Sequence, residues 1–238
     1  MRGPGTEYLS MLRSHATVDL VGPLGRGFAQ PKRRAHCLLV GGGIGAAPLF
    51  FLADELRNEG HRVDVILGAR TAGLLLSHIE ARRLASICRI TTEDGSQGET
   101  GRVTDILEET IDRCESEVIY TCGPHPMLAA VSRIAAQRKV PVQVAVEELM
   151  ACGYGVCMTC VMPLRRPTSR RSAQGENADE IIYARSCTEG PVFNGTAVVW
   201  NGATEVVSMD QSELSPAGVP VRQSALIEQD DEHAPPGN

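Results

Sequence analysis

The chain has 238 residues, of which 42% are hydrophobic and 22% charged, so it is long enough to bury one large core or two modest ones. Its net charge of −6 and its 4% of aromatic residues argue against nucleic-acid binding, because an acidic surface repels phosphates and few rings can stack on bases. The first residues lack the apolar core of a signal peptide, and no apolar run has the length of a membrane span. We therefore predict a cytoplasmic protein without membrane or nucleic-acid partners, in which clustered cysteines indicate metal or redox chemistry.

Short strands alternate with helices between residues 35 and 147. The expected strands are residues 36–40, 62–67, 87–92, 118–121 and 142–146, and the expected helices are residues 47–58, 75–84, 103–114 and 127–137. The second strand is apolar on both faces, as a parallel strand covered by helices should be. This alternation predicts an α/β fold with a parallel, doubly wound sheet.

A glycine-rich turn joins the first expected strand to the first helix. Gly41, Gly43 and Gly45 lie where a dinucleotide fingerprint belongs, because glycines let the backbone approach a pyrophosphate and a helix N-terminus favours its negative charge. The acidic residue that would hold the ribose of NAD is absent at the end of the second strand, where Arg70 follows Ala69. An arginine there suits a 2′-phosphate or simply faces solvent, so this position does not choose between NAD and NADP.

A second break follows the fourth expected strand, at Cys122 and Gly123. Parallel sheets bind ligands at the carboxyl ends of their strands, which favours a binding role for this break. Pro126 fits the alternative of an ordinary helix start equally well. We interpret His125 as a solvent-facing turn residue rather than a catalyst.

The strongest motif is a cluster of four cysteines. Cys152, Cys157 and Cys160 form the pattern C-x4-C-x2-C, and Cys187 follows later in the chain, which is the plant-type spacing of a [2Fe–2S] cluster. Glycines within the loop would let it wrap a cluster and aim N–H groups at its sulfurs. The alternatives are a structural zinc site, which usually has two C-x2-C pairs where this chain has one, and buried cysteines that bind nothing.

The rest of the chain is less regular. Residues 148–205 are a compact cysteine-rich region, interrupted by an arginine-containing polar loop at 165–177 that we interpret as a solvated insertion. Residues 206–238 are acidic and rich in proline and serine, and we predict them to be disordered. The scattered cysteines Cys37, Cys88 and Cys114 are expected to be small buried hydrophobic residues.

Five segments resemble a known group of proteins. The sequences GPLGRGF at residues 22–28, GGGIGAAPL at 41–49 and CGPHPM at 122–127 resemble the ferredoxin reductase superfamily. The sequences ELMACGYGVC at 148–157 and CTEGPVF at 187–193 narrow the resemblance to the electron transfer subunits of class 1B dihydroorotate dehydrogenases.

That resemblance implies a relay of electrons with no catalytic acid–base pair in this chain. A catalytic partner subunit would oxidise dihydroorotate to orotate on its FMN, in a heterotetramer with this one. Electrons would then cross the [2Fe–2S] cluster to FAD and leave as hydride to NAD⁺, in pyrimidine biosynthesis. By matching motifs, the four cysteines would be the cluster ligands, Gly5 and Thr6 would contact the FAD pyrophosphate, and Cys122 would lie near the nicotinamide.

The resemblance also implies a division into parts. Residues 1–34 would be the C-terminal remnant of an FAD-binding β-barrel, 35–147 the NAD(P)-binding domain, 148–205 the cluster domain and 206–238 a disordered tail. The strands that carry the flavin-seating motif of the family are missing, so the remnant cannot close a barrel and we expect a misplaced start codon or a fragment. The alternatives in function are a ferredoxin–NADP reductase or sulfide dehydrogenase α-type subunit, and a non-enzymatic iron–sulfur redox sensor or zinc-binding protein.

Overall fold

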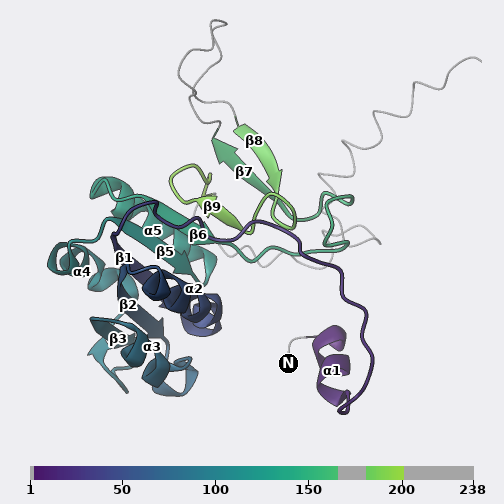
Figure 1. Cartoon of the computed structure of the whole chain (residues 1–238), viewed down its shortest axis with the longest axis horizontal. Helices are drawn as coiled ribbons and strands as arrows, with labels where there is room; N and C mark the ends of the chain where they lie inside the picture. Colours follow the sequence, from purple (N-terminus) through teal and green to yellow (C-terminus); the bar gives the residue numbers. More distant parts are fainter. Residues whose placement is uncertain (1–2, 166–180, 201–238) are drawn as a thin grey trace, which may run out of the picture. The chain divides into compact units, whose positions relative to one another are not determined.

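The computed structural model describes residues 3–165 and 181–200. A seven-stranded sheet forms its centre, with the strand order β4-β3-β2-β1-β5-β6-β9 (Figure 1). The seven strands are β1 (His36–Gly42), β2 (Arg62–Ala69), β3 (Cys88–Thr92), β4 (Glu99–Thr100), β5 (Val118–Cys122), β6 (Val142–Ala145) and β9 (Val192–Asn194). Every neighbouring pair is parallel except β6 and β9, which run antiparallel.

Helices cover both faces of this sheet. They are α2 (Ala47–Asn58), α3 (His78–Leu84), α4 (Leu107–Cys114) and α5 (His125–Gln137), with short 3-10 turns η1 (Gly43–Ala46), η2 (Ala72–Leu74) and η3 (Val103–Asp105). Because successive side chains of a strand point to opposite faces, Leu38 of β1 packs in a core with α4 and α5, whereas Leu39 packs with α2 and α3. None of the helices in the described part of the chain is long and apolar enough to cross a membrane.

The predicted doubly wound α/β fold is therefore confirmed for the central region. The helix predicted at 47–58 has those limits, and β1, β2 and β5 each extend one or two residues beyond their predicted ends. The helix predicted at 103–114 instead divides at Ile106 into η3 and α4. The short edge strand β4 was missed, since two residues carry no periodic signal.

Before β1 the chain has little regular structure. A short helix, α1 (Pro4–Met11), contains no buried residue, and the strands expected of a barrel remnant do not form in residues 3–35 beyond a single bridge between Arg26 and Pro191. The segment ahead of β1 is attached to the sheet by Gln143 of β6. The side-chain amide of Gln143 accepts from the Ala29 N–H at 2.8 Å and donates to the Ala29 carbonyl at 2.7 Å.

The cysteine-rich region shares the core of the central sheet. It contributes β9 to that sheet and forms a separate antiparallel pair, β7 (Val161–Arg165) and β8 (Ile181–Arg185). Met162, Ala184 and Phe193 are buried in the same cluster as Leu128 of α5. Strand β9 thus joins the two predicted domains 35–147 and 148–205 through one sheet. The predicted polar loop, apart from Arg165, and the predicted disordered tail lie outside the described residues.

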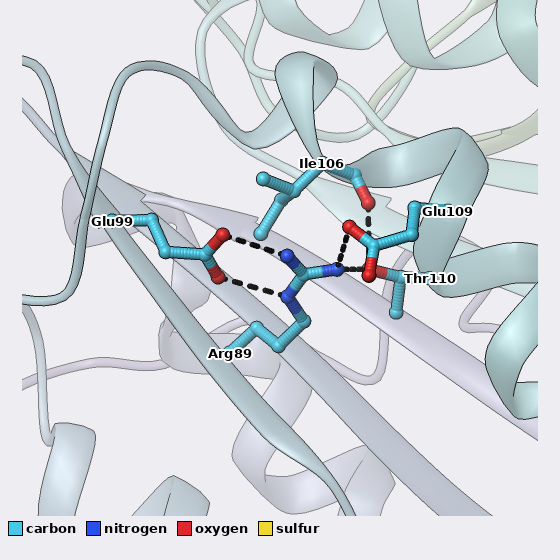
Figure 2. A network of polar contacts seen from close by, with 5 residues as sticks. All are labelled: Arg89, Glu99, Ile106, Glu109 and Thr110. Carbon is cyan, nitrogen blue, oxygen red and sulfur yellow. Dashed lines mark hydrogen bonds and ion pairs between the residues drawn. The ribbon is translucent and has the colours of Figure 1, made fainter.

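One polar network ties the edge of the sheet to a helix (Figure 2). Arg89 of β3 donates from Nε and Nη2 to the two carboxylate oxygens of Glu99, at 2.9 and 2.7 Å. Its Nη1 donates to Glu109 and to the Thr110 hydroxyl, both at 2.9 Å, and that hydroxyl in turn donates to the Ile106 carbonyl at 2.6 Å. A single guanidinium therefore connects β3, β4 and α4.

Candidate functional site

The glycine turn and the Cys-Gly break lie beside each other in space. Gly41 of β1 is in register with Cys122 of β5, the neighbouring parallel strand. A Cβ atom on Gly45 would lie 2.7 Å from the Cα of Gly123, so the two backbones touch where no side chain fits. Gly43 has a φ of +56°, which strains other residues. The structure thus brings together both motifs that the sequence indicated as dinucleotide contacts.

Their position in the sheet is the place where such folds bind ligands. From β1 the chain proceeds outward to β2, β3 and β4 on one side, and then returns to β5 and β6 on the other. The order therefore reverses between β1 and β5, and the crevice outside the carboxyl ends of these strands is the expected ligand site of an open α/β sheet. Arg70 lies exposed at the same edge, directly after β2.

Cys122 presents an uncharged thiol to this edge. It is partly buried, and burial together with the nearby charge of Glu147 raises the pKa of its thiol to about 11. The thiol therefore stays protonated at neutral pH.

The cysteine loop follows β6 and carries hydrogen-bond donors aimed at sulfur. Cys152 Sγ accepts from the backbone N–H groups of Val156 and Cys157, at 3.4 and 3.5 Å. The hydroxyl of Thr159 donates to Cys157 Sγ at 3.1 Å. On the other side, the N–H of Cys187 donates to the Sγ of buried Cys160 at 3.4 Å.

These donors favour thiolates over thiols on the exposed side of the loop. Hydrogen bonds, first from the Cys157 N–H, lower the pKa of Cys152. Hydrogen bonding, first from the Thr159 hydroxyl, lowers the pKa of Cys157 to about 6. Burial, and then its contact with Cys160, instead raises the pKa of Cys187. A metal or cluster would supply the positive charge that ionises Cys187.

The four cysteines are arranged as two adjacent pairs. The thiols of Cys152 and Cys157 contact each other, as do those of Cys160 and Cys187, and the charge of Cys152 also acts on Cys187. Within residues 3–165 and 181–200, no three Cys, His, Asp or Glu side chains enclose a space for one metal ion. Four thiol groups with N–H and O–H donors directed at their sulfurs nevertheless match the chemistry of an iron–sulfur centre.

Arg185 joins the two halves of this site and was not foreseen from the sequence. Its Nη1 donates to the carbonyl of Gly155 in the cysteine loop at 3.0 Å. Its Nε and backbone N–H both donate to Glu189 Oε2, at 3.1 and 2.8 Å. One side chain at the end of β8 thus connects the loop that holds Cys152 and Cys157 to the turn that holds Cys187.

His125 is exposed to solvent, as predicted, but it lies in a helix rather than a turn and its side chain has partners. It begins α5, and its Nε2 lies 3.0 Å from the Glu148 carboxylate. Its ring also meets the ring of Trp200 edge-on, with the centroids 6.0 Å apart. The hydrogen bond with Glu148 raises the pKa of the His125 imidazole. This pair ties α5 to the segment that leads into the cysteine loop.

The predicted FAD contacts lie outside these clusters. Gly5 and Thr6 are exposed residues of α1, and the Thr6 hydroxyl donates to the Gly3 carbonyl at 3.0 Å. The scattered cysteines behave as expected of buried hydrophobic residues: Cys37 and Cys114 are fully buried and Cys88 is partly so.

Comparisons with known proteins match the two segments that contain the cysteine loop and the glycine turn. The sequence profile "Iron-sulfur cluster binding domain of dihydroorotate dehydrogenase B" matches residues 147–199, and the profile "Oxidoreductase NAD-binding domain" matches residues 39–133. The chain is 37% identical over 198 residues to the "Dihydroorotate dehydrogenase B (NAD(+)), electron transfer subunit" of Desulforamulus reducens, covering 83% of this chain and 71% of that protein. The protein of the same name from Bacillus caldolyticus is 39% identical over 199 residues, with the same coverage.

A solved structure has the same fold over most of the chain. It is that of an NADH-dependent reduced ferredoxin-NADP oxidoreductase, with a TM-score of 0.65 and 28% identity. The match covers 84% of this chain and 67% of the other.

Proposed function

The chain belongs to the family of electron transfer subunits of NAD-dependent dihydroorotate dehydrogenase B, and from this premise we propose that its four clustered cysteines hold a [2Fe–2S] cluster. The chain is an oxidoreductase subunit with an iron–sulfur binding domain and an NAD-binding domain. Because the family is one of oxidoreductase subunits, we no longer consider a non-enzymatic redox sensor or zinc-binding protein as the function.

The observation that carries the cluster proposal is the set of donors around the sulfurs. Cys152, Cys157 and Cys160 each accept a hydrogen bond from the chain through Sγ. A reduced cluster carries additional negative charge on its sulfurs, and N–H and O–H groups already aimed at them stabilise it without reorganisation. The proposed ligands are Cys152, Cys157, Cys160 and Cys187. When bound, the cluster supplies one-electron transfer.

The dinucleotide site is proposed at the carboxyl ends of β1 and β5. Gly41, Gly43 and Gly45 would lie against the pyrophosphate of NAD, where the backbone can approach closely. Cys122 and Gly123 would face the nicotinamide. Cys122 is in register with Ala145 at the end of β6, and the cysteine loop follows that strand, so both proposed sites open from one edge of the sheet.

We further propose the remaining parts of the relay. Residues 1–34 would be the C-terminal remnant of an FAD-binding barrel, with Gly5 and Thr6 at the flavin pyrophosphate. A catalytic FMN-containing subunit would deliver two electrons from each dihydroorotate, and NAD⁺ would accept them as hydride. The assembly would be a cytoplasmic heterotetramer. Membership of the dihydroorotate dehydrogenase B family favours NAD⁺ as the acceptor, although Arg70 stands where an acidic ribose contact usually lies.

Anaerobic purification of the full chain with iron, sulfide, zinc and flavin analysis tests the cofactor content. We expect two irons and two sulfides per chain, as a [2Fe–2S] cluster requires, with visible absorbance that dithionite bleaches. Cys157→Ser should lose the colour, whereas Cys88→Ser, which removes a thiol of β3, should keep it. A colourless protein with one zinc would overturn the proposal.

A reconstitution separates this function from that of the structurally similar oxidoreductase. The full chain, mixed with FAD and a catalytic dihydroorotate dehydrogenase subunit, should reduce NAD⁺ when dihydroorotate is added. Electron transfer from reduced ferredoxin to NADP⁺, with no response to dihydroorotate, would instead assign the chain to the ferredoxin–NADP reductase type.

A further inference from the structure

Two buried hydroxyl groups flank Cys187 without partners. The Ser186 Oγ and the Thr188 Oγ1 are both inaccessible to solvent, and neither has a hydrogen-bond partner among the residues that the structure describes. A buried hydroxyl without an acceptor destabilises the fold, so such groups call for an explanation. Because both hydroxyls adjoin a proposed cluster ligand, the cluster itself is a candidate for the missing hydrogen-bond acceptor.

Thr188 is the one that faces the cysteine loop. A Cβ atom on Gly155 would lie 2.9 Å from Thr188 Cγ2 and 3.3 Å from its Oγ1. Gly155 stands between Cys152 and Cys157 in the chain. Ser186 has a different environment: it is fully buried, with its Cα 3.1 Å from the position of a Cβ on Gly190.

The surroundings hold Thr188 in this orientation. Its N–H donates to the Arg185 carbonyl at 3.2 Å, within the turn that also places Cys187. The Arg185 guanidinium in turn binds the Gly155 carbonyl and the carboxylate of Glu189, next to Thr188. The loop and the turn are thereby fixed against each other, with the threonine hydroxyl between them.

We propose that Thr188 donates a hydrogen bond to a sulfur of the [2Fe–2S] cluster and thereby raises the reduction potential of that cluster. This inference rests on the proposed cluster. The physical reason is that reduction adds negative charge to the sulfurs, so an O–H donor stabilises the reduced form more than the oxidised form. Thr188 is a tuning residue, since it is not a ligand.

The test measures the midpoint potential of the cluster by titration followed by electron paramagnetic resonance, in the full chain purified anaerobically. Thr188→Val removes the hydroxyl but keeps the shape of the side chain. It should lower the equilibrium constant for one-electron reduction about tenfold, which corresponds to about 59 mV. Thr188→Ser, which keeps the hydroxyl, should restore a potential close to that of the wild type.

A matched control removes another buried hydroxyl that lacks a partner. Ser132 of α5 also has an unpartnered Oγ, and it packs against Gly195 rather than the cysteine loop, so Ser132→Ala should leave the potential unchanged. An unchanged potential in Thr188→Val, with iron and sulfide at wild-type levels, would overturn the role of Thr188 alone. Absence of a [2Fe–2S] cluster from the wild type would overturn the proposed function itself.

A second measurement does not depend on how well the valine variant folds. In the reduced wild type, electron–nuclear double resonance should detect several exchangeable protons coupled to the cluster, since N–H groups and the Thr159 hydroxyl also donate to the cysteine sulfurs. The spectrum of Thr188→Ala should lack one of these exchangeable couplings and keep the others. If the variant keeps every exchangeable coupling of the wild type, Thr188 is not a donor and the inference fails.

Discussion

Replacing Arg89 by methionine tests whether the network at the edge of the sheet stabilises the dinucleotide-binding region. Methionine keeps much of the apolar stem of arginine, so the change removes the guanidinium with little loss of packing. The variant loses the two-pronged bond to Glu99 and the bonds to Glu109 and Thr110. Thr110 keeps its bond to the Ile106 carbonyl.

The exposure of the partners sets the size of the effect. The Arg89 side chain is 11% exposed, whereas Glu99 and Glu109 are 48% and 64% exposed, so water can solvate both carboxylates once the guanidinium is gone. The half-buried fork to Glu99 should contribute about 1.5 kcal/mol, at the low end for hydrogen bonds to charged groups. The more exposed Glu109 bond adds about 0.5 kcal/mol. The free energy of unfolding should therefore fall by about 2 kcal/mol, which lowers Tm by about 4–8 °C for a domain of this size.

Urea denaturation followed by circular dichroism measures this change, because urea leaves ion pairs unscreened. The control is Arg33→Met, which breaks an ion pair with Glu117 at 2.8 Å in which the arginine is 79% exposed. Because water solvates both partners, this change should cost much less stability than Arg89→Met. If Arg89→Met were no more costly than Arg33→Met, the argument from burial would be refuted.

The same network predicts a dependence on pH. The hydrogen bond from Arg89 lowers the pKa of Glu99. Its stabilisation is therefore present above the ordinary glutamate pKa of about 4.3 and is lost as the pH falls through the lowered value. The difference in stability between wild type and Arg89→Met should be complete at neutral pH and should narrow below about pH 4.

The other predictions concern the two proposed sites. Gly45→Ala places a methyl group against backbone and should weaken NADH binding by about tenfold or more in a fluorescence titration, whereas Gly73→Ala, whose new Cβ has its nearest neighbour at 3.9 Å, should not. Arg185→Met removes the hydrogen bond to the Gly155 carbonyl and should raise the rate at which a chelator removes iron about tenfold. An unchanged rate would show that the cysteine loop keeps its conformation without Arg185. The imidazole of His125 should titrate in NMR above the ordinary histidine pKa of about 6.5, and its contribution to stability should be present below that pH and disappear as the pH rises through the raised value. Glu148→Gln should abolish this upward shift.

Local patterns were enough to predict the central fold. Most residues of the strands β1, β2 and β5 are buried, and their largely apolar runs, interrupted in β2 by the buried Asp64, are the property that identifies parallel strands covered by helices. The helix α2 begins with Pro48 in its first turn and is followed by Gly60 at a φ of +84°, both of which are local signals of its limits.

Other elements had no local signal to read. Strand β9 is three residues long, and it is a strand because the edge of β6 is open to pair with it. The helix α1 covers only eight residues and buries none of them, so its sequence has no apolar periodicity from which it could be predicted.

By itself, the sequence indicated the candidate site residues: four cysteines at iron–sulfur spacing and two glycine-containing breaks at strand ends. These depend on the covalent spacing of residues close together in the chain, which any fold of this sequence must respect. Tertiary structure alone decided that Gly45 touches Gly123, that Arg185 joins the cysteine loop to the turn of Cys187, and that the side chain of Thr188 lies next to Gly155 of that loop. Such contacts join segments distant in the chain, and they arise only when the strands pair in register and the core closes around them.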